Sequence, residues 1–399
     1  MLKEVLIDSF RSCDSTHIQD IGGMLVLLGR NGTGKTNILR AIEWAARSAT
    51  STEPFGIEPY NLNQVTLRVD LGSLSYKYTI AFGLVNNELP EKKTIVVDLF
   101  EETVSVKGSS NSDWEQLVAR KNEQVNIGGT EVLKIGFTTP CIPALASLLP
   151  SGHAINQRLN PLRDFLVGVR YYPLDETNEL SSSSHDAGSL VSRAVYGAWS
   201  SRLKTNGDGG DSVIMRILHM HFERKEQFRE LISLLGKEGL GLVENIDIIT
   251  YNQPNDNDSL DSNSRVIYGV VFKPADASTT FDFSDLSVGT RRVLRILVSM
   301  LFDGSTVLLM EHPEDAVHAN LMRRLIGLLK TYTDPLQFIL ASHSSDVFNK
   351  LSPDEIRLVT MNKGLTALRP LNAEESEAAM NFVKRDGSLA DFLESIEEC

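Results

Sequence analysis

Residues 24–36 read MLVLLGRNGTGKT. The five apolar residues that open this stretch are typical of a buried strand, and the residues after it carry apolar side chains at helical spacing. A strand, a glycine-rich turn and a helix in this order form the context that a phosphate-binding loop, or P-loop, requires. We therefore expect this stretch to bind a nucleoside triphosphate. The residues expected to contact it are Asn31, Gly32, Thr33, Gly34, Lys35 and Thr36.

The residue types in this loop have a chemical reason. The glycines allow the backbone to curl until successive amides point at one anion. The helix that begins near Lys35 adds the positive end of its dipole. We expect the Lys35 ammonium to contact the β- and γ-phosphates and the Thr36 hydroxyl to bind Mg²⁺. A chance glycine turn is the simpler alternative, and the complete pattern with its flanks disfavours it.

A further anion-binding pattern lies in the C-terminal half. Ser287-Val288-Gly289 stands just before an apolar helix expected over residues 293–302. A hydroxyl and free amides at a helix start can bind an anion. Taken alone, an ordinary helix N-cap by Ser287 explains the pattern equally well.

Two apolar strands that end in polar residues follow. Residues 307–311 end in Glu311, which is the Walker B pattern, in which an acid at the end of a strand holds Mg²⁺ beside the P-loop. His312 and Glu314 come directly after it. Residues 337–342 form another buried strand that leads to His343, where an imidazole could reach a γ-phosphate or the attacking water. A lone histidine is more often structural, but its place after the other motifs favours a functional one.

The order of these motifs resembles that of the ABC-type ATPase head. More narrowly, it is similar to the RecF/SMC-related and OLD-like ATPases, AAA-type ATPases of bacterial phage defence and genome maintenance. The cues for this narrower group are Pro313-Glu314 followed by His318, and Ser342-His343-Ser344. The resemblance covers about residues 1–165 and 245–365. It implies an α/β fold in which a P-loop NTPase sheet and an antiparallel β-subdomain carry a helical insertion.

The resemblance also implies how ATP and Mg²⁺ would be held. In such proteins two heads enclose two ATP molecules, and each P-loop faces the signature motif of the other subunit. Ser287 and Gly289 would then contact the γ-phosphate from a second copy of the chain. Glu311 would join Thr36 at the metal, and His343 would be the switch histidine. A homodimer or higher oligomer around ATP is the expected state.

This sequence departs from the family pattern in three ways. First, His312 stands where a catalytic glutamate is expected. A neutral imidazole can accept a proton near pH 7, but we expect ATP hydrolysis to be slow or conditional. Glu314 is the other candidate base. The Q-loop glutamine is not placed, because Gln64 and Gln157 are both possible. The chain after residue 351 is too short for a nuclease module, so we expect a separate effector protein, a nuclease or a toxin.

Composition narrows the class of protein. The 399 residues are 42% hydrophobic and 23% charged, which is typical of a globular protein. No apolar run approaches the roughly 18 residues of a membrane span, and no signal peptide is recognisable, so a cytoplasmic location without membrane contact is expected. Cys13, Cys141 and Cys399 are too few and too widely spaced for a disulfide framework or a metal site. The net charge of −13 disfavours indiscriminate nucleic-acid binding, although a local basic groove remains possible.

Three parts are expected along the chain. Residues 1–172 form an N-terminal lobe, residues 173–240 a helical and loop insertion, and residues 241–399 a C-terminal lobe. The insertion is expected to include a short helix over about residues 189–203 and a second helical run over residues 213–235.

Within the N-terminal lobe the expected elements are mostly strands. Residues 1–20 form a hairpin whose second strand lies at a sheet edge. Period-two alternation between residues 64 and 106 predicts an antiparallel meander with turns at residues 72–73 and 85–87. Residues 107–130 are polar and glycine-rich and are expected to form a hairpin end or a loop.

Several functions are compatible with these motifs. The leading hypothesis is a stand-alone ATPase that dimerises around ATP and gates a partner effector, in anti-phage defence. A nucleotide-sensing scaffold that barely hydrolyses ATP is a second reading, and a repair ATPase of RecF/SMC type acting directly on DNA is a third. A P-loop kinase or GTPase is disfavoured, because neither would explain the Ser287-Val288-Gly289 segment or the strand that ends at His343.

Overall fold

The computed structural model describes residues 1–51, 63–89, 92–108, 113–129, 131–136, 139–172, 189–206, 212–252, 266–275, 279–344, 347 and 351–377. The chain divides into two compact units. The P-loop unit comprises residues 1–172, 305–312 and 326–399, and the helical unit comprises residues 173–304 and 313–325. The division passes through helix α8 (Ala319–Thr331).

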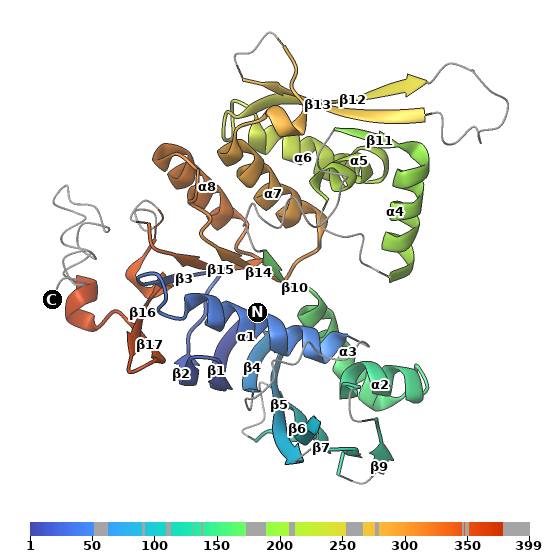
Figure 1. Cartoon of the computed structure of the whole chain (residues 1–399), viewed down its shortest axis with the longest axis vertical. Helices are drawn as coiled ribbons and strands as arrows, with labels where there is room; N and C mark the ends of the chain where they lie inside the picture. The colour runs from blue at the N-terminus through green and yellow to red at the C-terminus, as the bar shows by residue number, and fades with distance from the viewer. Residues whose placement is uncertain are drawn as a thin grey trace. The chain divides into compact units, whose positions relative to one another are not determined.

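The P-loop unit is built on one large mixed sheet (Figure 1). Its strands are β1 (Leu2–Phe10), β2 (Cys13–Ile18), β3 (Met24–Leu28), β4 (Asn63–Leu71), β5 (Leu74–Leu89), β6 (Lys92–Gly108), β7 (Glu115–Lys121), β8 (Gln124–Ile127), β9 (Glu131–Lys134), β10 (Val169–Tyr172), β14 (Val307–Glu311), β15 (Gln337–Ser342), β16 (Ile356–Asn362) and β17 (Leu365–Pro370). They are arranged in the order β10-β14-β15-β3-β16-β17-β2-β1-β4-β5-β6-β7-β8-β9.

The parallel part of this sheet positions the candidate site. Strands β10, β14, β15, β3 and β16 run parallel to one another. Every residue of β3 is buried, as expected for a strand covered on both faces. In the register of these strands, Glu311 pairs with Ala341, and Ala341 pairs with Leu27. The carboxyl ends of β3, β14 and β15 therefore meet at one edge of the sheet, where ligands of open α/β sheets bind.

The longer helices that lie wholly within the P-loop unit pack beside its sheet. They are α1 (Lys35–Thr50), α2 (Cys141–Leu148) and α3 (Ala154–Val167). Helix α1 packs against α2, α3 and β10, and its buried positions include Ile38, Leu39 and Ile42. These positions follow the helical spacing of the sequence, so burial of one apolar face explains why this segment is a helix.

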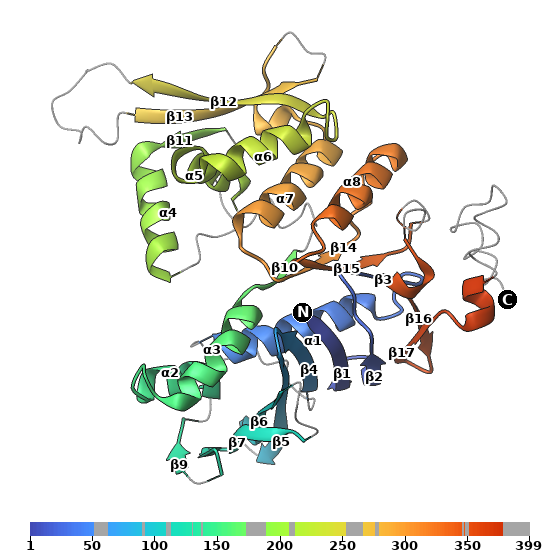
Figure 2. The same ribbon diagram turned by 180° about the vertical axis from the view of Figure 1, so that it is seen from behind.

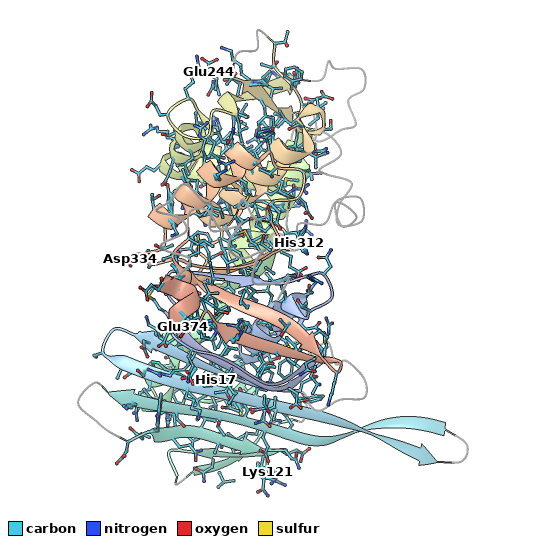
Figure 3. The ribbon with its side chains drawn as sticks, turned by 90° about the vertical axis from the view of Figure 1, so that its left-hand side faces the viewer. His17, Lys121, Glu244, His312, Asp334 and Glu374 are labelled. Atoms are coloured by element: carbon cyan, nitrogen blue, oxygen red, sulfur yellow. The ribbon has the colours of Figure 1, made fainter. Side chains whose placement is uncertain are left out.

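The antiparallel part of the sheet is a meander of β4 to β9. Figure 3 shows β5 and β6 as a long two-stranded arm, paired from Leu74–Gly108 to Leu89–Lys92. The core of the meander holds a buried carboxylate, that of Glu102. It accepts hydrogen bonds from the Cys141 amide (2.7 Å) and the Tyr78 hydroxyl (3.2 Å). Glu102 thereby satisfies an amide at the start of α2, and burial raises the pKa of its carboxyl.

The helical unit contains a small antiparallel sheet of order β11-β13-β12. Its strands are β11 (Leu190–Ser192), β12 (Val243–Asn252) and β13 (Val266–Pro274), and its helices are α4 (Arg193–Asn206), α5 (Val213–Glu223), α6 (Lys225–Leu235) and α7 (Val288–Phe302). Helix α7 packs against α5 and α6, and α6 packs against β12 (Figure 2). A buried ion pair, Arg216 to Asp303 at 3.1 Å, links α5 to the end of α7.

The expected fold class is confirmed, since a large mixed sheet, an antiparallel β-region and added helices are all present. The meander and its turn at residues 72–73 are confirmed as well. The three-part division of the chain stays a prediction. Among the helices that the structure describes, none is long and apolar enough to span a membrane.

Several local predictions were wrong. Strand β2 is not an edge strand, because it lies between β17 and β1. Residues 85–87 continue β5 instead of turning. Within residues 107–130, where a hairpin end or a loop was expected, β7 and β8 form an antiparallel hairpin. The helical run over residues 213–235 is two helices, because Arg224 leaves the helical conformation (φ −133°, ψ 61°).

Candidate nucleotide site

The P-loop connects the buried strand β3 to helix α1. Gly34 caps the helix with φ +99°, and Gly32 has φ +81°, so both occupy conformations that favour glycine. They differ in their surroundings. A Cβ at Gly34 would lie 1.9 Å from Thr366 Oγ1, whereas a Cβ at Gly32 would have no atom within 4 Å. Gly34 is therefore required both by its backbone and by close packing.

The loop rests on a small polar network that the sequence gave no reason to single out. Ser12 Oγ lies 2.7 Å from Thr366 Oγ1, and the Thr366 amide donates to the Ser12 carbonyl (2.8 Å). Asn37 Nδ2, at the start of α1, donates to Ser12 Oγ (2.7 Å). The β1–β2 turn, strand β17 and the first turn of α1 are thus fixed to one another. Only pairing between segments far apart in the chain reveals this network.

Lys35 lies at the base of the loop. Its side chain is buried, with 4% of its surface exposed, and its Nζ donates to the carbonyls of Gly29 (2.5 Å) and Arg30 (2.9 Å). Thr33 Oγ1 donates to the same Arg30 carbonyl (2.9 Å). These bonds hold the ammonium inside the curl of the loop, which is the place from which it can meet a phosphate.

A cavity of about 170 Å³ opens at this loop. It is lined by residues 31–37 and by His312. All six predicted P-loop residues line it, and so does Asn37, which the sequence did not nominate. The structure therefore brings His312, at the end of β14, to the same cavity as the P-loop.

Glu311 ends β14 and has the features of a cation ligand. Its Oε1 atom is buried and has no hydrogen-bond partner in the part of the chain that the structure describes. A buried carboxylate oxygen without a partner is costly unless a cation or water satisfies it. Burial and the neighbouring Glu311 carboxylate raise the pKa of Tyr171, and the guanidinium of Arg40 stacks 3.9 Å from the Tyr171 ring centre. This oxygen therefore fits a cation such as Mg²⁺, and Glu311 and Thr36 stay its predicted ligands.

The two predicted histidines contact each other. Nδ1 of His343 lies 3.1 Å from Nδ1 of His312, and the ring centres are 5.0 Å apart. His312 adopts a left-handed backbone (φ 44°), and its amide donates to the Ala341 carbonyl (2.9 Å). This bond fixes His312 against β15, the strand that leads to His343. The sequence predicted that both residues belong to the site, but it gave no sign of the direct contact.

The remaining predicted residues belong to the helical unit. Ser287 is exposed and caps α7, where its Oγ accepts from the Thr290 amide (3.2 Å). Gly289 is buried, and a Cβ there would lie 2.4 Å from the Ala316 carbonyl oxygen. Glu314 precedes that same turn. Because these residues lie in the other unit, their part in nucleotide binding stays a prediction.

Neither candidate for the Q-loop glutamine lines the cavity. Gln64 Nε2 donates to Asp8 Oδ2 (3.0 Å), which ties β4 to β1. Gln157 is exposed on α3. The Q-loop position therefore remains unassigned.

The chain is similar to one known protein family over part of its length. Residues 156–349 match the family model described as "AAA domain, putative AbiEii toxin, Type IV TA system". The match spans just under half of the chain and includes Ser287, Glu311 and His343, but it excludes the P-loop. It makes this region similar to an ATPase domain. None of the curated proteins matches the chain.

Solved structures of SMC head domains are similar to the chain. One is an SmcHead bound to the C-winged helix domain of ScpA (14% identity, TM-score 0.48, 94% of this chain and 99% of that chain). Another is the SMC head domain from Thermotoga maritima (14% identity, TM-score 0.44, 93% of this chain and 99% of that chain). A third is an Smc head domain with an extended coiled coil bound to the C-terminal domain of ScpA derived from Pyrococcus furiosus (13% identity, TM-score 0.45, 96% of this chain and 99% of that chain). At these values the likeness assigns neither an activity nor a partner.

Proposed function

We propose that this chain is an ATPase that binds Mg²⁺·ATP at the P-loop and hydrolyses it slowly. The observation that carries the proposal is the cavity at Gly32, Gly34 and Lys35, because it combines curled backbone, a buried ammonium and a helix start in one place. The match of residues 156–349 to an ATPase domain supports it independently, since that match does not include the P-loop.

Each residue of the site has a definite task in this proposal. The loop amides and the Lys35 ammonium bind the phosphates, and Lys35 exchanges its carbonyl partners for phosphate oxygens when ATP enters. Mg²⁺, held by Thr36 and Glu311, neutralises charge that develops on the phosphate oxygens. The orphaned Oε1 atom of Glu311 supports this assignment, because a bound cation would satisfy it.

The histidine pair would replace the usual glutamate base. A hydrogen bond between two Nδ1 atoms requires that one ring donates its proton and the other accepts. If neutral His312 is the donor, its Nε2 carries a lone pair and can accept a proton from the attacking water. His343 then orients His312 and accepts a stronger hydrogen bond as His312 becomes charged. An imidazole is a serviceable base near pH 7, but it lacks the fixed negative charge of a glutamate.

Turnover assays separate hydrolysis from simple binding. Wild type should release phosphate slowly, Lys35→Ala should release none above background, and His312→Glu should be faster than wild type. Two outcomes would contradict the proposal: phosphate release by Lys35→Ala at the wild-type rate, or release that does not require Mg²⁺. If wild type binds ATP and does not hydrolyse it, the scaffold reading replaces the enzymatic one.

The narrower part of the proposal concerns assembly and role. We propose that two copies close around ATP, that Ser287 and Gly289 of one copy contact the γ-phosphate held by the other, and that closure gates a separate nuclease or toxin in anti-phage defence. The description of the matched family names a putative toxin of a toxin–antitoxin system, which supports a toxin-related role without naming a partner. Native mass measurements with the slow variant His312→Ala should show dimers only with Mg²⁺·ATP. Monomers under all nucleotide conditions would refute this assembly.

A further inference from the structure

His312 and His343 bring two ring nitrogens close together. Their Nδ1 atoms are 3.1 Å apart, and the rings meet at 63°. At zinc–imidazole distances of about 2.0–2.1 Å, two neighbouring ligands in tetrahedral or octahedral geometry lie about 2.9–3.4 Å apart. The 3.1 Å between the two Nδ1 atoms therefore lies in the range for two histidines on one metal ion, and also in the range for a hydrogen bond.

We propose that His312 and His343 form a binding site for a borderline divalent transition metal such as Zn²⁺. This site is separate from the Mg²⁺ position expected at Thr36 and Glu311, which offers only oxygen ligands. Imidazole nitrogens favour Zn²⁺, Co²⁺ and Cu²⁺ over Mg²⁺, so the two positions select different ions. The proposal goes beyond ATP binding and does not require that the chain hydrolyses ATP.

The local backbone already holds the pair in place. His312 is kept in a left-handed conformation by the bond from its amide to the Ala341 carbonyl, and Ala341 lies two residues before His343. The backbone segments that carry both rings are therefore fixed to one another. Because His312 lines the P-loop cavity, water or a phosphate oxygen can supply the remaining ligands.

Metal binding requires only a change of tautomer. In the hydrogen-bonded pair one ring carries its proton on Nδ1. When the metal binds, that proton moves through solvent to Nε2 of the same ring, and both Nδ1 lone pairs become ligands. No net proton is released from the neutral pair. Since Nε2 of His312 then carries a proton, Zn²⁺ should inhibit any turnover that uses His312 as a base.

Co²⁺ spectroscopy tests the site directly, because Co²⁺ replaces Zn²⁺ and its visible absorption reports nitrogen ligation. Full-length chain without a polyhistidine tag is titrated with Co²⁺ in the absence of nucleotide, and then with Zn²⁺ as competitor. We expect one Co²⁺ per chain that Zn²⁺ displaces. His343→Gln keeps a hydrogen-bonding side chain but is a poor metal ligand, so its affinity should fall at least about tenfold. His312→Gln should behave in the same way.

His17→Gln is the matched control, because His17 lies on β2 and pairs with Glu4 instead of with a second histidine. Its Co²⁺ affinity should equal that of wild type. Equal Co²⁺ binding by wild type and His343→Gln would overturn the proposal, as would the absence of any Co²⁺ signal in wild type. Thermal unfolding of each variant shows that it is folded. Failure of ATP hydrolysis would leave the Co²⁺ result unaffected, so the two proposals can fail separately.

Discussion

Replacement of Gly34 by alanine tests whether packing, and not only backbone conformation, shapes the P-loop. The new Cβ would stand 1.9 Å from Thr366 Oγ1, and Thr366 is held in place by Ser12. Thr366 must therefore move, and the Ser12 bond must weaken. Gly32→Ala is the matched control, because Gly32 has a similar positive φ (+81°) and no atom within 4 Å of its Cβ position.

The magnitudes follow from these two environments. A left-handed conformation costs an alanine about 1–2 kcal/mol, and both variants lose this amount. Only Gly34→Ala adds an overpacked contact, which costs about 1–3 kcal/mol more. We therefore expect Gly34→Ala to lower the free energy of unfolding by about 2–5 kcal/mol, against about 1–2 kcal/mol for Gly32→Ala.

Urea unfolding measures these free energies, and a double-mutant cycle with Thr366→Ala isolates the contact. Thr366→Ala removes the oxygen that Gly34→Ala would strike, so it should cost less in the Gly34→Ala background than in wild type. Equal losses for the two glycine variants would refute the reasoning. So would a cycle in which the effects of Gly34→Ala and Thr366→Ala simply add.

Three further predictions concern buried charges and thiols. Burial raises the pKa of the Glu102 carboxyl above its usual 4.5, so ionisation of this group destabilises the folded state. Glu102→Gln should therefore gain stability relative to wild type as pH rises from about 4.5. A pH-independent difference between the two in urea unfolding would contradict this. Arg216→Met breaks the buried ion pair with Asp303 and should cost about 3–5 kcal/mol, most of which Asp303→Leu should restore in the double variant. Burial raises the pKa of Cys13 to about 11 and that of Cys141 well above its usual range, so iodoacetamide at pH 8 should modify neither thiol until the chain unfolds, as read by peptide mass spectrometry.

The sequence was most informative where local pattern and chemistry coincide. The P-loop, the acid at the end of β14 and the histidine after β15 were predicted from residues 24–36, 307–312 and 337–343 and from the order of these motifs along the chain. Each is a buried strand followed at once by polar residues, and a parallel sheet brings such ends to one edge. Local pattern therefore sufficed to predict that the ends of these strands lie together, whereas His312 was assigned to the site by the family resemblance.

The sequence was least informative where distant pairing decides. Ser12 and Thr366 support the P-loop through a contact across 354 residues, which no local pattern reveals. Residues 85–87 look like a turn but continue β5, because pairing with β6 extends the strand through them. The Nδ1–Nδ1 contact of His312 and His343 depends on the register of β14 against β15, which becomes visible only in the folded chain.

Calorimetric binding of Mg²⁺·ATP to wild type and Lys35→Ala tests the central claim most directly. Lys121→Ala is the control, since Lys121 is an exposed lysine of β7 that pairs with Glu101 and lies away from His312 (Figure 3). Loss of a charge-assisted bond of about 1.5–3 kcal/mol should weaken ATP binding about tenfold to hundredfold in Lys35→Ala. Wild type and Lys121→Ala should bind ATP equally well. Wild-type affinity in Lys35→Ala would contradict the assignment of this loop as the nucleotide site.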